Sequence, residues 1–196
     1  MYELPTSIFI NDIEYTIRNK GDFRMVLDCL AALQDPELEN EYKVITALMI
    51  FFEVFESYAD IDTHSKHLEP MVREMFKFIN GGQEGSPGAN KNTTLIKWKE
   101  DCQIICAAVN NVAGHEIRVV PYMHWWTFLG YFMSVGQSVL STVVSIRYKT
   151  SRGKRLEKWE QDFKKENPQY FKTTVSKEEQ EWLDYIEAMW NKGGAD

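Results

Sequence analysis

A stretch of 28 residues without a formally charged side chain does most to limit the folds open to this chain of 196 residues. It covers residues 119–146 and is flanked by Arg118 and Arg147, so a transmembrane helix has to be considered. The stretch also contains a proline, a histidine, two glycines and six serines or threonines. Its polar segment 134–138 leaves two halves, each shorter than the ~20 apolar residues that a membrane span needs. We therefore predict two buried helices joined by a turn at 134–138, and no membrane span.

Elsewhere, hydrophobic residues recur at three- and four-residue steps, which is typical of amphipathic helices. Three such segments lie in the N-terminal half: 23–33, which follows the cap Asp22; 36–52, which Asp35-Pro36 opens; and 68–79, which ends at Asn80-Gly81-Gly82. A further helix is marked by Leu156, Trp159 and Phe163 and ends at Asn167-Pro168. A C-terminal helix is predicted at about 176–191. The apolar residues 49–52 are expected near the centre of the core.

The N-terminus differs from the rest because its residues favour strands. Two β-rich runs, 8–10 and 13–17, are separated by Asn11-Asp12, a pair that tolerates the left-handed conformation of a tight turn. The predicted fold is therefore mainly α, a helical domain of about six to seven helices with a short N-terminal β-hairpin. We expect a single domain over residues 1–196, with a mobile loop at 81–92, where small polar residues follow one another.

The charges are unevenly distributed along the chain. The net charge is −7. Residues 1–98 carry 16 acidic and 9 basic side chains, whereas residues 99–196 carry 13 of each. The segment 35–62 is locally acidic and the segment 147–155 is basic. Three cysteines without a disulfide-like spacing and an N-terminus without a signal peptide indicate a reducing cytoplasm.

Two groups of residues carry side chains that can bind a metal ion. His64 and His67 lie within the segment 60–67, which also holds two aspartates, but Lys66 separates the histidines and no distant ligand has a recognisable spacing. An exposed turn between helices with ordinary polar residues explains this segment better. Cys102 and Cys106 lie in an apolar segment and are interpreted as small core residues. We predict no metal ion and no cofactor.

Catalytic patterns are equally scarce. His115 and His124 could each act as a general base, but neither is accompanied by a nucleophile motif. The sequence also has no P-loop and no dinucleotide-binding glycine pattern. The prediction is a protein that is not an enzyme.

The basic segment offers a surface for a partner. Its charged residues are Arg147, Lys149, Arg152, Lys154 and Arg155, with a tyrosine among them. Nucleic acid is a weak alternative, because acidic residues follow at once and the whole chain is acidic. An acidic protein surface, including segment 35–62 of a second copy, fits better and would orient association. The predicted partner-binding residues are these five together with Trp159, Trp182 and Trp190.

Three ordered segments, residues 122–129, 140–147 and 153–160, resemble the gene-product-fifteen family of siphophages that infect Gram-positive bacteria. The resemblance extends to Asp101 with Cys106-Ala-Ala after it, and to an N-terminal hairpin followed by Asp22-Phe23-Arg24. The residues that carry the motif, which are expected to be structural, are His124, Trp125, Trp126, Phe128, Ile146 and Arg147. Residues beyond Asn167 match no pattern of the family.

The resemblance implies a role in tail assembly. Members are encoded beside the tape measure protein, so a tail assembly chaperone that binds the tape measure protein is expected, together with a smaller partner chaperone. Self-association into a homo-oligomer is expected from the acidic and basic segments of the chain. Such a factor would act in the host cell cytoplasm and be absent from the mature virion. The alternatives are a structural virion protein for tail completion or connection, and a host-interaction or nucleic-acid-binding regulatory protein. The family implies no catalytic residues.

Overall fold

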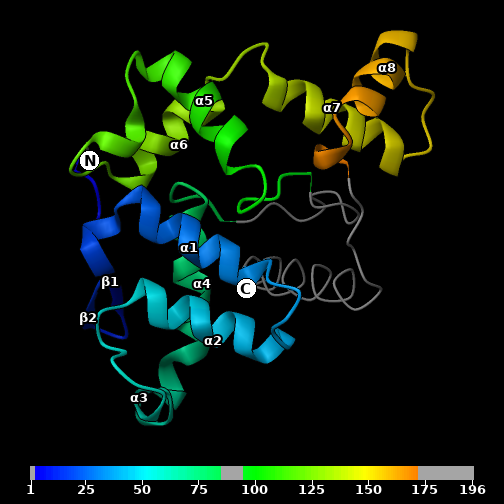
Figure 1. Cartoon of the computed structure of the whole chain (residues 1–196). Helices are drawn as coiled ribbons and strands as arrows, with labels where there is room; N and C mark the ends of the chain where they lie inside the picture. The colour runs from blue at the N-terminus through cyan, green and yellow to red at the C-terminus, as the bar shows by residue number, and fades with distance from the viewer. Residues whose placement is uncertain (1–2, 85–94, 172–196) are drawn as a thin grey trace.

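The structure is a computed structural model that describes residues 3–84 and 95–171 (Figure 1). In chain order, its elements are β1 (Ser7–Ile10), β2 (Ile13–Thr16), η1 (Arg18–Gly21), α1 (Phe23–Leu33), α2 (Asn40–Phe51), α3 (Ala59–Thr63), η2 (Ser65–His67), α4 (Leu68–Ile79), α5 (Cys102–Ala113), η3 (Ile117–Val119), α6 (Trp125–Met133), α7 (Val139–Ser151), α8 (Lys158–Glu166) and η4 (Pro168–Tyr170). The mainly α fold with an N-terminal hairpin is thus confirmed. The predicted C-terminal helix at 176–191 and most of the loop at 81–92 lie outside the described residues.

The N-terminal hairpin forms as its turn residues require. Asn11 and Asp12 both have positive φ angles, 50° and 63°, which is the signature of the type I′ turn that suits the twist of a hairpin. Strand β1 pairs antiparallel with β2. Asp22 then caps α1, because its Oδ1 accepts a hydrogen bond from the Arg24 amide at 3.0 Å.

Helices α1 and α2 lie side by side and antiparallel (Figure 1). The prediction that Asp35-Pro36 opens α2 is wrong, since the helix begins at Asn40. Asp35 Oδ1 instead accepts a hydrogen bond from the Glu37 amide at 2.9 Å and forms a local turn. The Asp35 side chain thus accepts a backbone hydrogen bond, but it stabilises a turn between helices and caps no helix.

The uncharged stretch folds into two helices, α6 and α7, joined by a turn at 134–138, as predicted. They are not buried throughout, because each helix buries only one face. Ser138 closes a capping box with Ser141 at the start of α7, so the polar residues that interrupt the hydrophobic run also begin the second helix. In the part of the chain that the structure covers, no helix combines the length and the hydropathy that crossing a bilayer requires.

Aromatic side chains join the helices in one core. Phe23 of α1 stacks on Phe128 of α6, with ring centroids 4.9 Å apart and planes 5° apart, and Phe128 stacks in turn on Trp125. Phe51 of α2 meets Phe78 of α4 edge to face, with centroids 5.2 Å apart. These offset and edge arrangements are the favourable ones for aromatic rings. The expectation that segment 49–52 reaches the core centre holds for Phe51 and Phe52, which are fully buried.

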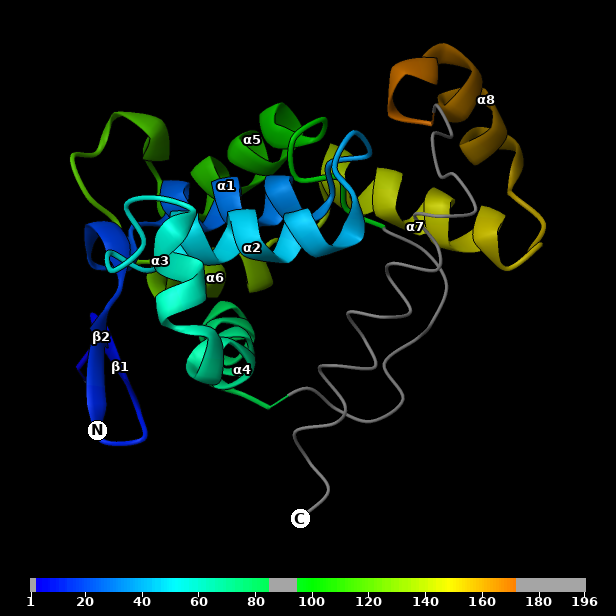
Figure 2. The same cartoon turned by 90° about the horizontal axis from the view of Figure 1, so that it is seen from below.

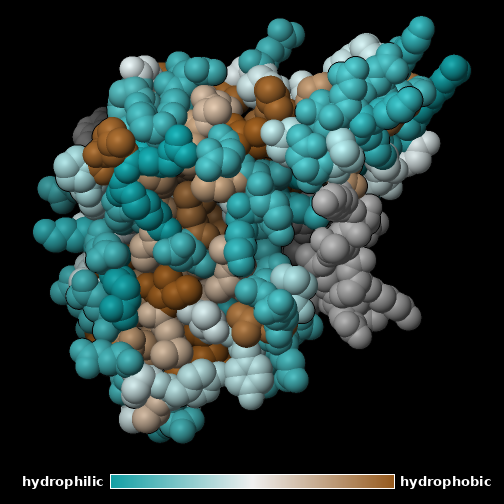
Figure 3. All heavy atoms as spheres, in the orientation of Figure 1, coloured by the Kyte–Doolittle hydropathy of each residue, from teal (hydrophilic) through white to brown (hydrophobic). Residues whose placement is uncertain are grey.

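The arrangement of the layers leaves α7 and α8 at one side of the molecule. In Figure 2, α1 and α2 lie between α4 and α5, while α7 and α8 extend away from them. Hydrophobic side chains gather in the middle of the face shown in Figure 3, over the region of α1 and α2. The corner occupied by α7 and α8 is mostly hydrophilic on that face. We call residues 139–166, which contain α7, α8 and their connection, the arm.

Candidate partner-binding surface

A buried ion pair ties the arm to the rest of the chain. Arg147 on α7 donates from both terminal nitrogens to the carboxylate of Asp101, which immediately precedes α5; Nη2 lies 2.9 Å from Oδ1. The same guanidinium donates to the carbonyls of Leu95 and Tyr170. The side chain of Arg147 is 9% exposed and that of Asp101 is 1% exposed. Because the planar guanidinium of Arg147 donates to one carboxylate and two carbonyls, we interpret it as a structural anchor of the arm.

A second internal pair fixes α8 against α7. Lys149 Nζ lies 2.7 Å and 2.9 Å from the two carboxylate oxygens of Glu160, whose side chain is 1% exposed. The backbone amide of Glu157 also donates to Glu160, within the capping box that starts α8. The hydrogen bond from the Lys149 ammonium is the main cause that lowers the pKa of Glu160, and the one from the Glu157 amide is the next. Sequence reasoning missed Glu160, because it treated the acids of α8 only as neighbours that dilute the basic segment.

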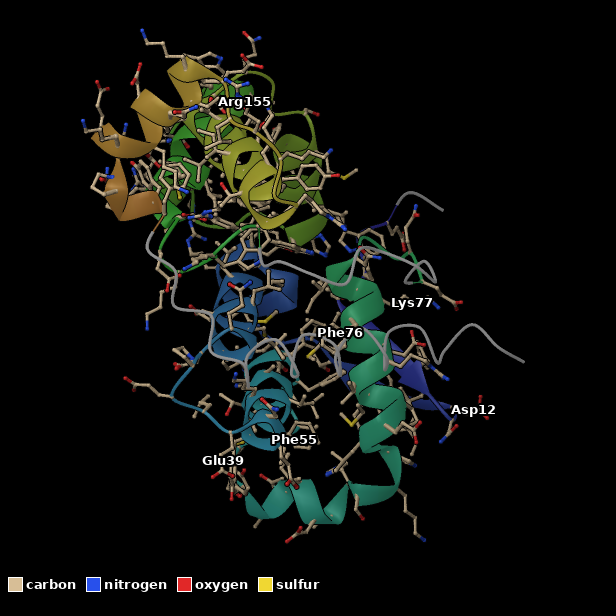
Figure 4. All side chains as sticks on the ribbon, turned by 90° about the vertical axis from the view of Figure 1, so that its right-hand side faces the viewer. Asp12, Glu39, Phe55, Phe76, Lys77 and Arg155 are labelled. Atoms are coloured by element: carbon tan, nitrogen blue, oxygen red, sulfur yellow. The ribbon has the colours of Figure 1, made fainter. Side chains whose placement is uncertain are left out.

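The other basic residues of the segment remain on the surface. Gly153 has a φ of +61°, and the amides of Gly153 and Lys154 bond back to the last turn of α7. This is the Schellman ending, for which glycine is the favoured residue. Past that turn, Arg152, Lys154 and Arg155 are exposed. Figure 4 shows Arg155 at the opposite end of the molecule from Glu39 in the acidic segment.

Aromatic side chains accompany these exposed charges. Tyr148 is 37% exposed, and the Lys154 ammonium lies 5.1 Å from the centroid of its ring. Trp159 is 57% exposed, as a partner-binding residue has to be, and Leu156 precedes α8, so Leu156, Trp159 and Phe163 do not mark one helix face. Leu156 and Phe163 are partly buried, whereas Trp159 faces solvent. We call Tyr148, Arg152, Lys154, Arg155 and Trp159 the arm surface.

The His-Trp-Trp block has a different task, which is to join α6 to α4. The indole N–H of Trp125 donates to the Ile79 carbonyl at 2.7 Å, and that of Trp126 donates to the Phe78 carbonyl at 2.8 Å. Both acceptors are in the last turn of α4, where carbonyls lack partners within the helix. Trp125 and Phe128 are buried and Trp126 is partly buried.

His124 caps α6 and also holds the N-terminus of the chain. Its Nδ1 accepts a hydrogen bond from the Trp126 amide at 3.0 Å, and its Nε2 donates to the Pro5 carbonyl at 3.0 Å. These two partners require a neutral ring that carries its proton on Nε2. Burial lowers the pKa of His124, which favours the same neutral form. His124 therefore has a structural role as the cap of α6, because its ring is buried and both of its nitrogens form hydrogen bonds.

The family model of the Bacteriophage Gp15 protein matches residues 1–171. The chain belongs to the bacteriophage Gp15 family. No curated protein and no solved structure matches it. Gp15 proteins form a structural or assembly family of bacteriophages, not a family of known enzymes.

In this Gp15 chain, the residues that carry the family resemblance lie inside. Asp101, His124, Trp125, Phe128 and Ile146 are all buried, and Arg147 is the anchor of the arm. Arg147 therefore belongs with the motif and not with the surface, although the basic segment suggested both roles. Lys149 is likewise paired within the chain. Trp182 and Trp190 lie outside the described residues, so their part in partner binding stays a prediction.

The histidine and cysteine groups have local partners. His67 Nδ1 lies 2.6 Å from the Tyr15 hydroxyl, while His64 Nδ1 donates to the Asp60 carbonyl at 2.8 Å. We expected an exposed turn at residues 60–67, but most of this segment is helical and belongs to α3 and η2. Within residues 3–84 and 95–171, no three His, Cys, Asp or Glu side chains are grouped as metal ligands would be.

The two cysteines of α5 are separate thiols. Their sulfurs are 4.0 Å apart and form no disulfide. Burial, followed by the neighbouring Cys102, raises the pKa of Cys106 to about 11, so this thiol is protonated at neutral pH. Cys106 is buried and Cys102 partly buried, which agrees with their interpretation as small packing residues.

Proposed function

We propose that this Gp15 protein is a tail assembly chaperone that binds the tape measure protein through the arm surface. Family membership supports a role in phage structure or assembly. The observation that carries the finer proposal is the exposure of Trp159 and Tyr148 in the same segment as three exposed basic residues, on an arm that two internal ion pairs hold in place. The smaller partner chaperone and a location in the host cytoplasm are part of the same proposal.

The chemistry of the arm surface suits one kind of partner. An exposed tryptophan on a rigid support contributes strongly to protein–protein binding, because its large apolar ring loses little side-chain entropy. The adjacent arginines and lysine favour an acidic rim around that contact and orient the approach. The partner surface that fits best is an amphipathic helix whose apolar stripe is bordered by Asp and Glu. A tape measure protein presents long helices with apolar faces.

Co-expression with the tape measure protein tests the proposal. The wild-type chain is expected to keep the tape measure protein in the soluble fraction, and Trp159→Ala and the triple variant Arg152→Glu, Lys154→Glu, Arg155→Glu are expected to lose this effect. Phe9→Ala is the matched control for the tryptophan, because Phe9 is 68% exposed on the distant hairpin. Lys66→Glu, Arg73→Glu, Lys99→Glu is the matched control for the charge change, since all three side chains are exposed.

Two results would contradict the proposal. One is a tape measure protein that is equally insoluble with and without the wild-type chain. The other is equal loss of solubility with the arm variants and their controls, which would mean that binding does not use the arm surface. Mass spectrometry of purified virions separates a chaperone, which leaves, from a tail-completion or connector protein, which stays.

A further inference from the structure

A short segment after α2 pairs with the chain at the end of the two-stranded hairpin. Phe52, just past the end of α2, forms an antiparallel bridge with Ile17, and the amide of Glu53 donates to the Thr16 carbonyl at 3.1 Å. Residues 52–53 thus occupy the place of a third strand beside the end of β2. The chain then turns away at 53–54, so no strand lies beside the rest of this edge of β2 in the described part of the chain.

The open stretch of β2 presents backbone groups for pairing. The type I′ turn makes Ile10 and Ile13 the pair that closes the hairpin with hydrogen bonds, so the next pair, Phe9 and Glu14, directs its amides and carbonyls outward. The outward carbonyl of Thr16, which Glu53 uses, agrees with this alternation. Among residues 3–84 and 95–171, the outward amide of Glu14 donates no hydrogen bond. An exposed strand edge of this kind is a template for another strand.

A groove lies beside β2 and is lined in part by all four residues of that strand. Its volume is about 580 Å³. The residues that line it are Ile13, Glu14, Tyr15, Thr16, Glu53, Val54, Thr63, His64 and His67. The Tyr15 hydroxyl and His67 Nδ1 bond to each other at 2.6 Å, which fixes two of the lining side chains. The groove combines a strand edge with fixed polar side chains.

The charges around the groove indicate what it would accept. Glu14 and Glu53 are exposed at its rim. Residues 53–67, which supply five of the lining residues, contain four acidic residues and one lysine. Ile13 is 47% exposed at the same edge and offers an apolar contact. Because side chains of a strand alternate between two faces, an occupant with basic and apolar residues in alternation could satisfy both.

We propose that the groove beside β2 binds an extended, basic peptide segment of another protein, which adds to the sheet as a strand in the place that residues 52–53 begin. Backbone pairing with Glu14 supplies the affinity, and the acidic rim selects lysine or arginine at alternate positions. The site is separate from the arm surface, so it does not depend on the proposed chaperone role.

A proline scan of the two hairpin edges tests the proposal. Glu14→Pro removes the outward amide on the groove side, whereas Phe9→Pro removes the matching outward amide on the opposite edge, and proline is accepted at such edge positions. The probe is a fluorescent eight-residue peptide of alternating valine and lysine, measured by anisotropy with the full-length protein. We expect Glu14→Pro to weaken binding at least tenfold and Phe9→Pro to change it less than twofold. Glu14→Gln separates the loss of charge from the loss of the amide.

A second probe keeps the test independent of how the proline variants fold. The same peptide N-methylated at every residue retains its charge but cannot donate backbone hydrogen bonds, and it is expected to bind the wild-type protein at least tenfold more weakly. Equal binding of the methylated and unmethylated peptides would overturn the proposal, because it would show a purely electrostatic contact. So would equal binding to the two proline variants. A dimer that dissociates only in Glu14→Pro would give the groove to a second copy instead.

Discussion

Arg147 and Asp101, which are 46 residues apart in the chain, form a forked and nearly solvent-free ion pair between α7 and the start of α5. The carboxylate is held further by the amide of Lys97 at 2.8 Å. Because the arm carries the candidate partner surface, this pair contributes to fixing where that surface is presented. Removing either partner leaves the other charge buried without compensation, which is the costly way to break such a pair.

The first prediction concerns this pair. Asp101→Ala is expected to lower the free energy of unfolding by about 3–5 kcal/mol, because the Arg147 guanidinium stays buried without its counter-charge. Urea unfolding followed by tryptophan fluorescence measures the change. The matched control is Glu116→Ala, which removes the partner of Arg118 in a more exposed pair and is expected to cost much less than Asp101→Ala. Similar losses in both variants would contradict the structural role given to Asp101.

The second prediction concerns the indole of Trp125. Trp125→Phe keeps an aromatic ring in the core but removes the donor to the Ile79 carbonyl, so a loss of about 1–3 kcal/mol in the free energy of unfolding is expected. Trp159→Phe is the control, because its ring faces solvent, and its expected effect is within about 0.5 kcal/mol. Chemical denaturation of both variants gives the comparison. No difference between them would show that the hydrogen bond at the end of α4 contributes nothing.

The third prediction is a dependence of stability on pH that originates at His124. Burial lowers its pKa from the usual value of 6.5, so the unfolded chain binds the proton more readily than the folded one. Its contribution is complete above about pH 6.5 and declines as the pH falls below that value, because protonation removes the Nδ1 acceptor of the Trp126 amide. Thermal unfolding between pH 7.5 and 5.5 measures it. His124→Asn, which retains a capping oxygen, is expected to flatten the profile.

The fourth prediction concerns Gly153, where α7 ends. Gly153→Ala places a side chain at a φ of +61° and is expected to destabilise the protein by about 1–2 kcal/mol. Gly130→Ala is the control, because this glycine lies within α6 with open space around it, and alanine there is expected to stabilise by about 0.5–1 kcal/mol. Differential scanning calorimetry resolves the two signs. Stabilisation in both variants would contradict the Schellman ending.

Local features of the fold could be predicted from the sequence because they depend on neighbouring residues. Asn11-Asp12 specifies a turn with positive φ, Asp22 places an acceptor at a helix start, and Gly81-Gly82 permits the ending of α4. Asp35-Pro36 shows the limit of the same reasoning. An aspartate before a proline suits a turn as well as a helix start, and the chain between α1 and α2 uses it for the turn.

The candidate site was predicted only in part, because its geometry depends on residues far apart in the chain. The basic segment was found, but composition could not tell that Arg147 and Lys149 turn inward while Arg152 and Arg155 stay outside. The decisive partners are single acids, Asp101 and Glu160, which no periodicity singles out. The groove beside β2 was missed for the same reason, since it depends on where residues 52–53 leave the sheet.

The contact between His124 and the Pro5 carbonyl sets an order of events during synthesis of the chain. The two residues are 119 positions apart, and Tyr122 and Lys20, joined by a hydrogen bond, are 102 apart. At a translation rate of about 5–20 residues per second, roughly 6–24 s pass between the emergence of the first segment and that of its partner. During this interval Pro5 and Lys20 lack the partners that bind their carbonyls in the folded chain. The N-terminal segment can therefore make these two contacts only after residues 122–124 leave the ribosome.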